Sequence, residues 1–233
     1  MNLRIGISPC PNDTYIMEAI YEKQIDIEPF SFEFIFEDVE TLNRLAQKGE
    51  MDVLKMSYAT FLQVTHNYCM LRSGSALGRG VGPLLITTLK NIHVDLSTLH
   101  LAIPGINTTA NFLLQFAFPE ITNKTEMVFS EIENAILEHK VDAGVIIHEN
   151  RFTYANKGLQ KIADLGSIWE EKKKLPIPLG GIAVLRKLSF AYQHQLNQLI
   201  YKSIAYANAR TEKISPFIRH HAQELSDDVI KQH

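Results

Sequence analysis

The sequence of 233 residues has few cysteines, no long apolar run and no excess of charge of one sign. Its two cysteines, Cys10 and Cys69, are too few for a disulfide framework, which favours a reduced, cytoplasmic setting. No apolar run reaches the roughly 18 residues that a membrane helix needs, and the N-terminus shows no signal region or cleavage site. We therefore expect neither a membrane span nor a secretory signal.

The charge balance argues against nucleic acid as a partner. The net charge is -3 and the isoelectric point is about 6.3, and no basic stripe interleaved with aromatic residues occurs. The run Lys172–Lys174 follows two glutamates and is expected to be a solvated patch. The length and the ordinary apolar content allow one large domain or two small lobes with a sizeable core.

Strand and helix patterns alternate along the chain, which predicts an α/β fold with mostly parallel sheets. The expected strands span residues 3–8, 30–36, 52–56, 83–89, 99–103, 125–129, 141–147 and 179–186. The expected helices span residues 13–23, 39–48, 58–64, 109–116, 130–140 and 188–209. Gly49 is a plausible stop for the second helix, and Ser130 with Glu133 forms a capping box for the fifth.

Two successive series of strands and helices predict two lobes. We expect residues 1–90 and 178–233 to form the first lobe and residues 91–177 to form the second. The chain would then cross between the lobes near residues 89–98 and 172–179. Two lobes joined by two crossings would leave a cleft that can close on a ligand.

His148 is the strongest candidate for chemistry. It follows Val141–Ile147, an apolar strand rich in β-branched residues, and open α/β sheets bind ligands beyond the carboxyl ends of their strands. Histidine is the side chain best suited to moving protons near neutral pH. Because Glu149 and Arg151 follow at once, packing alone explains this polar break poorly.

Three other expected strands also give way to small polar residues. Ser8–Thr14 follow the first strand, Ser57 follows the third, and Pro104–Thr109 follow a later one. A carboxylate or phosphate at the helix that begins with Thr108 and Thr109 would gain hydroxyl and backbone N–H bonds. Each site alone is more readily explained as an ordinary helix cap. All four together favour a site for a small anion.

The densest glycine segment, Ser73–Pro83, matches neither a dinucleotide-binding fingerprint nor a phosphate-binding Walker loop. It fits equally well a flexible loop that presents Arg79 to an anion and a plain connection. Cys10 fits either a thiol at a helix start or, more simply, a small packing residue. The adjacent residues His220 and His221 do not share a helix face, and no other metal-ligand spacing occurs, so we expect no metal site.

Several of these segments resemble the 1,4-dihydroxy-6-naphthoate synthase family, which belongs to the futalosine route to menaquinone. The similarity runs from residue 3 to the C-terminal end of the sequence. The segments that carry it are Ser8–Thr14, Lys55–Ser57, Ser75–Pro83, Ile146–Tyr154 and Leu175–Gly181. The family's chains usually continue with a further helical stretch past the position of His233.

The resemblance implies a two-lobed fold like that of type II periplasmic solute-binding proteins, turned to catalysis. It implies a lyase without a cofactor that converts cyclic dehypoxanthinyl futalosine to 1,4-dihydroxy-6-naphthoate and dihydroxyacetone. The family's proton acceptor falls on His148. Its orienting partner stays open, and Glu149 is close to it in sequence. The substrate-binding positions fall on Lys55, Met56, Ser57, Thr108 and Thr109. Further candidates are Ser8, Asn12 and Arg79, and both Arg79 and Lys55 are candidates for binding the substrate carboxylate.

Two other functions stay open at this point. A non-catalytic binding protein of the same fold would use the same helix N-termini to hold a small anion. A secretory signal would have favoured that reading, and none is seen. The chorismate-dehydrating enzyme of the same pathway has a related two-lobed fold, but the segment around His148 favours the synthase.

Overall fold

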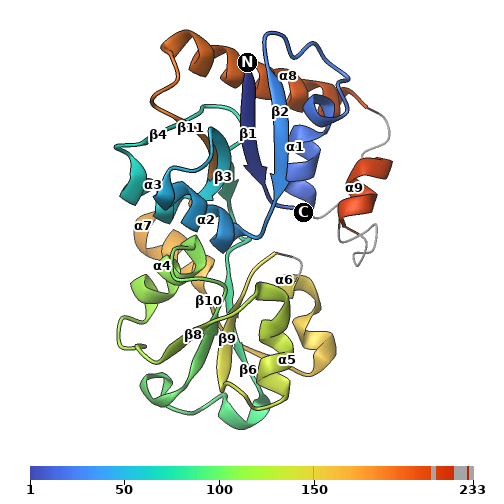
Figure 1. Cartoon of the computed structure of the whole chain (residues 1–233). Helices are drawn as coiled ribbons and strands as arrows, with labels where there is room; N and C mark the ends of the chain where they lie inside the picture. The colour runs from blue at the N-terminus through green and yellow to red at the C-terminus, as the bar shows by residue number, and fades with distance from the viewer. Residues whose placement is uncertain (149, 211–213, 223–229, 231–233) are drawn as a thin grey trace. The chain divides into compact units, whose positions relative to one another are not determined.

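A computed structural model describes residues 1–148, 150–210, 214–222 and 230 of the chain (Figure 1). The chain divides into two compact units, the first formed by Met1–Ala76 with Gly180–His233 and the second by Leu77–Leu179. The first crossing therefore lies at residues 76 and 77, earlier than the expected 89–98. The reason is that β6 (Leu84–Thr87) pairs with strands of the second unit rather than with strands of the first.

The sheet of the first unit is mixed. Its strands lie in the order β2 (Ser31–Phe36), β1 (Asn2–Ile7), β3 (Val53–Ser57), β11 (Ile177–Leu185) and β4 (Tyr68–Met70), and β5 (Ala76–Gly78) also pairs with β11. Strand β1 runs parallel to β2 and β3, whereas β11 runs antiparallel to β3 and β4. The helices of this unit are α1 (Pro11–Tyr21), α2 (Val39–Lys48), α3 (Tyr58–Val64), α8 (Phe190–Ala209) and α9 (Pro216–His221).

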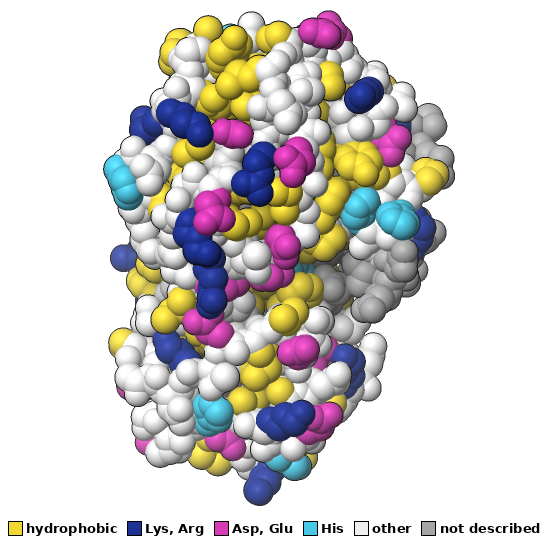
Figure 2. Space-filling model, in the orientation of Figure 1, with side chains coloured by type: hydrophobic (Ala, Val, Ile, Leu, Met, Phe, Trp, Pro, Cys, Tyr) yellow, Lys and Arg dark blue, Asp and Glu magenta, His cyan; other side chains and the backbone are white. Residues whose placement is uncertain are grey.

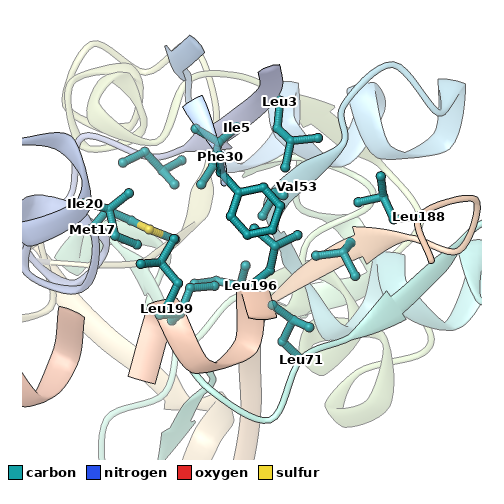
Figure 3. Close-up of a cluster of buried hydrophobic side chains, with 14 residues drawn as sticks. Leu3, Ile5, Met17, Ile20, Phe30, Val53, Leu71, Leu188, Leu196 and Leu199 are labelled. Atoms are coloured by element: carbon teal, nitrogen blue, oxygen red, sulfur yellow. The ribbon is translucent and has the colours of Figure 1, made fainter. Parts of the chain in front are cut away.

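Strand β1 anchors the core of the first unit because its apolar side chains are almost completely buried. Leu3, Ile5 and Ile7 are each at most 2% exposed, and they pack with residues of α1, β11 and α8 (Figure 3). Burying one such side chain contributes roughly 1.5–3 kcal/mol. The carboxyl end of β1 is thereby fixed, and with it the polar residues that follow.

The sheet of the second unit is mixed as well. Its strands lie in the order β10 (Gln160–Asp164), β6, β9 (Ala143–Ile146), β7 (Leu101–Ile103) and β8 (Lys124–Glu126). Its helices are α4 (Thr109–Ala117), α5 (Ile132–Leu137), α6 (Asn150–Thr153) and α7 (Leu165–Lys173), and α5 lies beside β9 in Figure 1. Short 3-10 helices span Leu89–Asn91, Leu96–Thr98, Phe129–Glu131 and Tyr154–Lys157.

The expectation of mostly parallel sheets is wrong for a topological reason. Strands β6 and β11 enter their sheets directly after a crossing between units, without a helical crossover from a neighbouring strand. Both run antiparallel to their neighbours: β6 to β9 and β10, and β11 to β3 and β4. The β1–β2–β3 and β7–β8–β9 groups keep the parallel arrangement that alternation predicts.

The prediction of a capping box at the start of α5 is also wrong. The helix begins at Ile132, and the residue that precedes it, Glu131, makes no side-chain cap bond. Glu133 is instead 1% exposed and accepts hydrogen bonds from Asn150 Nδ2 (2.8 Å) and Lys157 Nζ (2.7 Å). The Glu133 carboxylate, which the capping pattern assigned to the start of the helix, therefore binds side chains that are distant in sequence. The elements that the sequence did not suggest are β4, β5, β10, α6, α7 and α9.

No helix in the described part of the chain is long and apolar enough to cross a membrane. On the face drawn in Figure 2, Lys and Arg side chains alternate with Asp and Glu, so the described residues there form no continuous basic stripe.

Candidate functional site

A buried ion pair lies where β1 ends in the first unit. Lys55 Nζ donates to Asp13 Oδ1, and the side chains are only 12% and 5% exposed. Ser8 donates to the other oxygen of the same carboxylate, from its backbone N–H at 3.1 Å and from its hydroxyl at 2.7 Å. Asp13 thus binds together the end of β1, the first turn of α1 and the middle of β3.

Burial would by itself raise the pKa of Asp13, because it disfavours the charged carboxylate. The neighbouring Lys55 ammonium and the hydrogen bonds from Lys55 and Ser8 outweigh that effect and hold the pKa of Asp13 below its usual value. Asp13 is therefore a carboxylate at neutral pH, and it neutralises the charge of Lys55. This makes Lys55 a weaker candidate than a solvent-facing cation for binding a substrate carboxylate.

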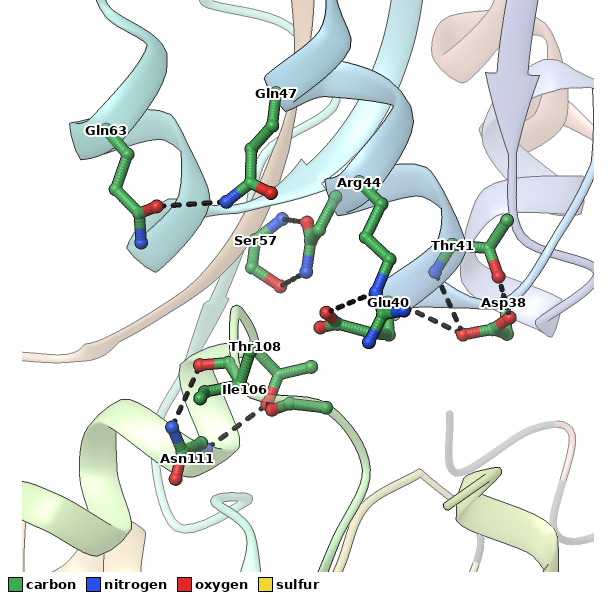
Figure 4. A network of polar contacts seen from close by, with 12 residues as sticks. Asp38, Glu40, Thr41, Arg44, Gln47, Ser57, Gln63, Ile106, Thr108 and Asn111 are labelled. Carbon is green, nitrogen blue, oxygen red and sulfur yellow. Dashed lines mark hydrogen bonds and ion pairs between the residues drawn. The ribbon is translucent and has the colours of Figure 1, made fainter. Parts of the chain in front are cut away.

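Ser57 is fixed by Asn43 of α2. Asn43 Nδ2 donates to Ser57 Oγ at 3.1 Å, and the Ser57 N–H donates to Asn43 Oδ1 at 2.9 Å (Figure 4). Both residues are buried, and Met56 beside them is fully buried in the core. Ser57 precedes α3 but makes no side-chain cap bond, so its hydroxyl is held by Asn43 rather than used as a cap.

Glycines leave room beside Lys55 and Ser57. Gly180 and Gly181 of β11 pair with Ser57 and Met56 of β3. A Cβ at Gly180 would lie 2.9 Å from the Met56 carbonyl oxygen and 3.2 Å from Lys55 Cε. Gly180 therefore allows the backbone of β11 to approach Lys55 and Met56 closely.

Thr108 and Thr109 begin α4 in the second unit. Thr108 is the N-cap, since its Oγ1 accepts from the Asn111 N–H at 3.2 Å (Figure 4). The same hydroxyl donates to the Gly105 carbonyl at 2.7 Å. Thr109 Oγ1 donates to the Leu179 carbonyl at 2.9 Å. Both threonines are at least 95% buried, so the structure uses their hydroxyls to shape the turn.

His148 follows β9 in an unusual backbone conformation. Its φ of 54° lies in the left-handed region, which costs a non-glycine residue on the order of 1 kcal/mol or more. The imidazole is partly buried and meets the Phe129 ring edge-on, with 5.1 Å between the ring centroids. The expected neighbour Glu149 lies outside the described residues.

The remaining candidates lie at the edges of these clusters. Asn12 is half-buried in the first turn of α1, and Cys10 precedes that helix. Arg79 is exposed, directly before Gly80, whose φ of 67° is left-handed. Within the described residues, no three His, Cys, Asp or Glu side chains are grouped to hold a metal ion.

Three residues of these clusters escaped the sequence analysis as site components. Asp13 and Asn43 each bind a candidate residue that is distant in sequence: Asp13 binds Lys55, and Asn43 binds Ser57. Arg151 was noted only as a charge after His148, yet its guanidinium binds the glycine loop through the Gly80 and Gly82 carbonyls. The positions of Asp13 in the Ser8–Thr14 segment and of Arg151 in the Ile146–Tyr154 segment gave a signal, whereas Asn43 gave none.

Solved structures of other proteins define the class of this fold. The chain superimposes with a TM-score of 0.74 on the alkanesulfonate-binding protein from Xanthomonas axonopodis pv. citri, at 13% identity over 99% of this chain and 82% of that one. Together with similar matches to other binding proteins, this confirms the expected fold of the type II periplasmic-binding-protein class. A crystal structure of a protein from Archaeoglobus fulgidus matches more strongly, with a TM-score of 0.92 and 32% identity over 99% of this chain and 86% of that one.

The sequence profile of the menaquinone biosynthesis family matches residues 3–233, and the chain belongs to that family. Two curated relatives carry the name 1,4-dihydroxy-6-naphtoate synthase. The one from Thermus thermophilus is 44% identical over 99% of this chain and 84% of its own length. The one from Streptomyces coelicolor is 38% identical over 99% of this chain and 83% of its own length.

Proposed function

We propose that the protein is a carbon–carbon lyase of menaquinone biosynthesis that produces 1,4-dihydroxy-6-naphthoate. The observation that carries this proposal is the identity of 44% and 38%, over nearly the whole chain, to relatives named for that synthase activity. Cyclic dehypoxanthinyl futalosine is the proposed substrate, and dihydroxyacetone is the second product. Cys10 and Cys69 are not joined in a disulfide, which suits the cytoplasm, the proposed location.

His148 is the proposed proton acceptor. In its neutral form the imidazole removes a proton from the substrate, and the electron pair released drives a retro-aldol-like cleavage of a C–C bond. The three-carbon fragment leaves, and the remaining ring becomes aromatic. The position of His148 after the carboxyl end of β9 supports this role, since open α/β sheets place ligands at such ends.

Of the proposed substrate-binding hydroxyls, that of Ser57 is best placed to donate a hydrogen bond to the substrate. Its oxygen accepts from Asn43 Nδ2, so its own hydrogen is left to donate to a carboxylate or carbonyl oxygen. The Thr108 hydroxyl, in contrast, both donates to Gly105 and accepts from Asn111. We infer that Thr108 and Thr109 serve a ligand mainly through the backbone N–H groups at the start of α4.

The charged groups take different parts in this proposal. Lys55 is held in place by Asp13 and provides a fixed donor without net charge, whereas exposed Arg79 is the better partner for the substrate carboxylate. Ser8 and Asn12 lie in the same part of the first unit as Asp13 and are proposed to support it.

Incubation of the protein with cyclic dehypoxanthinyl futalosine tests the proposal. Appearance of 1,4-dihydroxy-6-naphthoate, measured by its absorbance and mass, together with one equivalent of dihydroxyacetone is the expected result. Binding of the substrate without turnover would point instead to a non-catalytic binding protein. Turnover of chorismate but not of the cyclic substrate would point to the dehydrating enzyme of the pathway. Either outcome would overturn the proposed function.

A further inference from the structure

The turn that carries His148 is too short to hold its own shape. His148 has a left-handed backbone, and the helix that follows it, α6, has only four residues. A single helical turn is unstable by itself, and a strained backbone persists only where its surroundings fix it. The contacts of the residues just after His148 therefore help to fix its backbone, alongside the ring contact between its imidazole and Phe129.

Arg151 makes the most extensive of these contacts. Its guanidinium donates to the Gly82 carbonyl, to the Gly80 carbonyl at 2.8 Å and to Asp164 Oδ2 at 2.9 Å. The Arg151 side chain is 18% exposed and that of Asp164 is 13% exposed. One planar group thus joins the His148 turn to the glycine loop and to the end of β10, all within the second unit.

The groups that Arg151 binds are themselves rigid. The other oxygen of Asp164 caps α7 by accepting from the Ser167 N–H at 3.0 Å, and the Gly80 N–H donates to Glu170 Oε1 at 2.8 Å. The backbones of Gly82 and Gly166 touch so closely that a Cβ on Gly82 would lie 2.4 Å from Gly166 Cα. Arg151 therefore connects the short turn after His148 to the closely packed backbone at Gly82 and Gly166.

A second contact ties the same turn from the other side. Asn150 donates to the buried carboxylate of Glu133, which Lys157 also binds. This anchor lies toward α5, whereas the Arg151 anchor lies toward the glycine loop. Two anchors in different directions fix both the position and the rotation of the turn.

We propose that Arg151 is a positioning residue, which holds His148 where it can accept the substrate proton by binding the Gly80 and Gly82 carbonyls. This inference rests on the proposed function of His148. Misplacing a catalytic group by about 1 Å costs up to about 100-fold in rate, so loss of the planar guanidinium should lower kcat. Ser57 is held by Asn43 in the first unit, and the bond from the Gly80 N–H to Glu170 still holds the loop that carries Arg79, so KM should stay nearly constant.

Arg151→Lys is the central variant, because it keeps the charge but replaces the fork with a single ammonium. We expect kcat to fall about 10- to 100-fold with KM within about threefold of the wild-type value. Asp164→Asn removes the charge of only one acceptor and keeps a capping oxygen for α7, so its loss of kcat should be smaller. Arg186→Lys is the matched control: Arg186 Nε also donates to a carbonyl, that of Thr65 at 2.7 Å, but in the first unit.

A readout independent of turnover is the imidazole NMR signal of His148, assigned by its absence in His148→Asn. Arg151→Lys should shift or broaden this signal, and Arg186→Lys should leave it in place. Unchanged kcat, a loss confined to KM, or an unmoved His148 signal in Arg151→Lys would each overturn the positioning role. If wild-type protein forms no naphthoate, the proposed function fails, and the NMR signal alone decides whether Arg151 positions His148.

Discussion

The polar cluster of the first unit and the His148 turn of the second are held in place by different means. Asp13 and Ser8 are buried, and the Lys55 side chain is only 12% exposed. An ion pair and hydrogen bonds join the three residues, which lie at regular strands and helices. His148 is partly buried, has a left-handed backbone and precedes a helix of one turn. The first region is therefore fixed by polar contacts among its own residues, whereas the second depends on contacts with residues from elsewhere in its unit.

The largest expected effect is on catalysis at His148. His148→Asn removes the proton acceptor but keeps a residue that tolerates a left-handed backbone, so we expect kcat to fall roughly 10²–10⁴-fold. Binding of the substrate, measured by calorimetry, should persist, because the proposed binding groups are elsewhere.

His139→Asn is a close control, since His139 also has a left-handed backbone, with φ of 57°, at the end of α5. Its kcat should match the wild type. Near-normal turnover in His148→Asn would contradict the role of His148 as the proton acceptor.

The next effect in size concerns the ion pair of the first unit. Asp13→Asn leaves the Lys55 ammonium buried without its carboxylate, and we expect a loss of about 3 kcal/mol in the free energy of unfolding. Urea denaturation at neutral pH measures it. The double variant Asp13→Asn with Lys55→Met should regain most of the loss. A single variant as stable as the wild type would show that this region does not depend on its charge pair.

Substitutions of Gly80 and Gly82 test how closely the backbone packs near Arg151 in the second unit. Gly82→Ala would place a Cβ 2.4 Å from Gly166 Cα and 2.6 Å from its nitrogen, so backbone must move, at a cost of about 3 kcal/mol. Gly80→Ala meets no atom within 4 Å and adds only the strain of a left-handed alanine, about 1 kcal/mol. Equal thermal unfolding of the two variants would contradict a closely packed junction beneath Arg151.

The smallest expected effect is on acid stability. The pKa of Asp13 is lower in the folded than in the unfolded chain, so its contribution to stability is present above its ordinary pKa and is lost as pH falls through the folded pKa. Asp13→Asn should therefore lose slightly less stability than the wild type on acidification below about pH 4. The other acidic residues are common to both proteins, so the difference between the two curves reports Asp13 alone. Parallel stability curves over that range would exclude a linked carboxylate.

Elements with local signals were predictable from the sequence. The bounds of α2 and α3 are those expected, Val39–Lys48 and Tyr58–Val64. For α2 the reason is visible in the chain, since Gly49 supplies the left-handed residue, φ 70°, that ends the helix. Strand β10 was missed because its first two residues are exposed and its sequence, Gln-Lys-Ile-Ala-Asp, carries too little apolar alternation to signal a strand.

The candidate residues were predictable as strand ends, but their partners were not. Lys55 is 42 residues from Asp13, and Arg151 is 69 residues from Gly82, so no spacing in the sequence links them. Glu133 is a second example of a partner that the sequence does not reveal. A local pattern predicts that its carboxylate caps a helix, but the carboxylate binds Asn150 and Lys157 instead. Which side chains meet is decided by the sheet order, and that order depends on where the chain crosses between units.

The place of β11 between β3 and β4 has a consequence for the order in which a growing chain can fold. Val184 pairs with Cys69, so β4 has no neighbour in its sheet until 115 further residues have been made. The second unit, in contrast, is complete in sequence at Leu179. On a ribosome, the inserted unit can therefore form its native sheet before strand β11 of the first unit has been made.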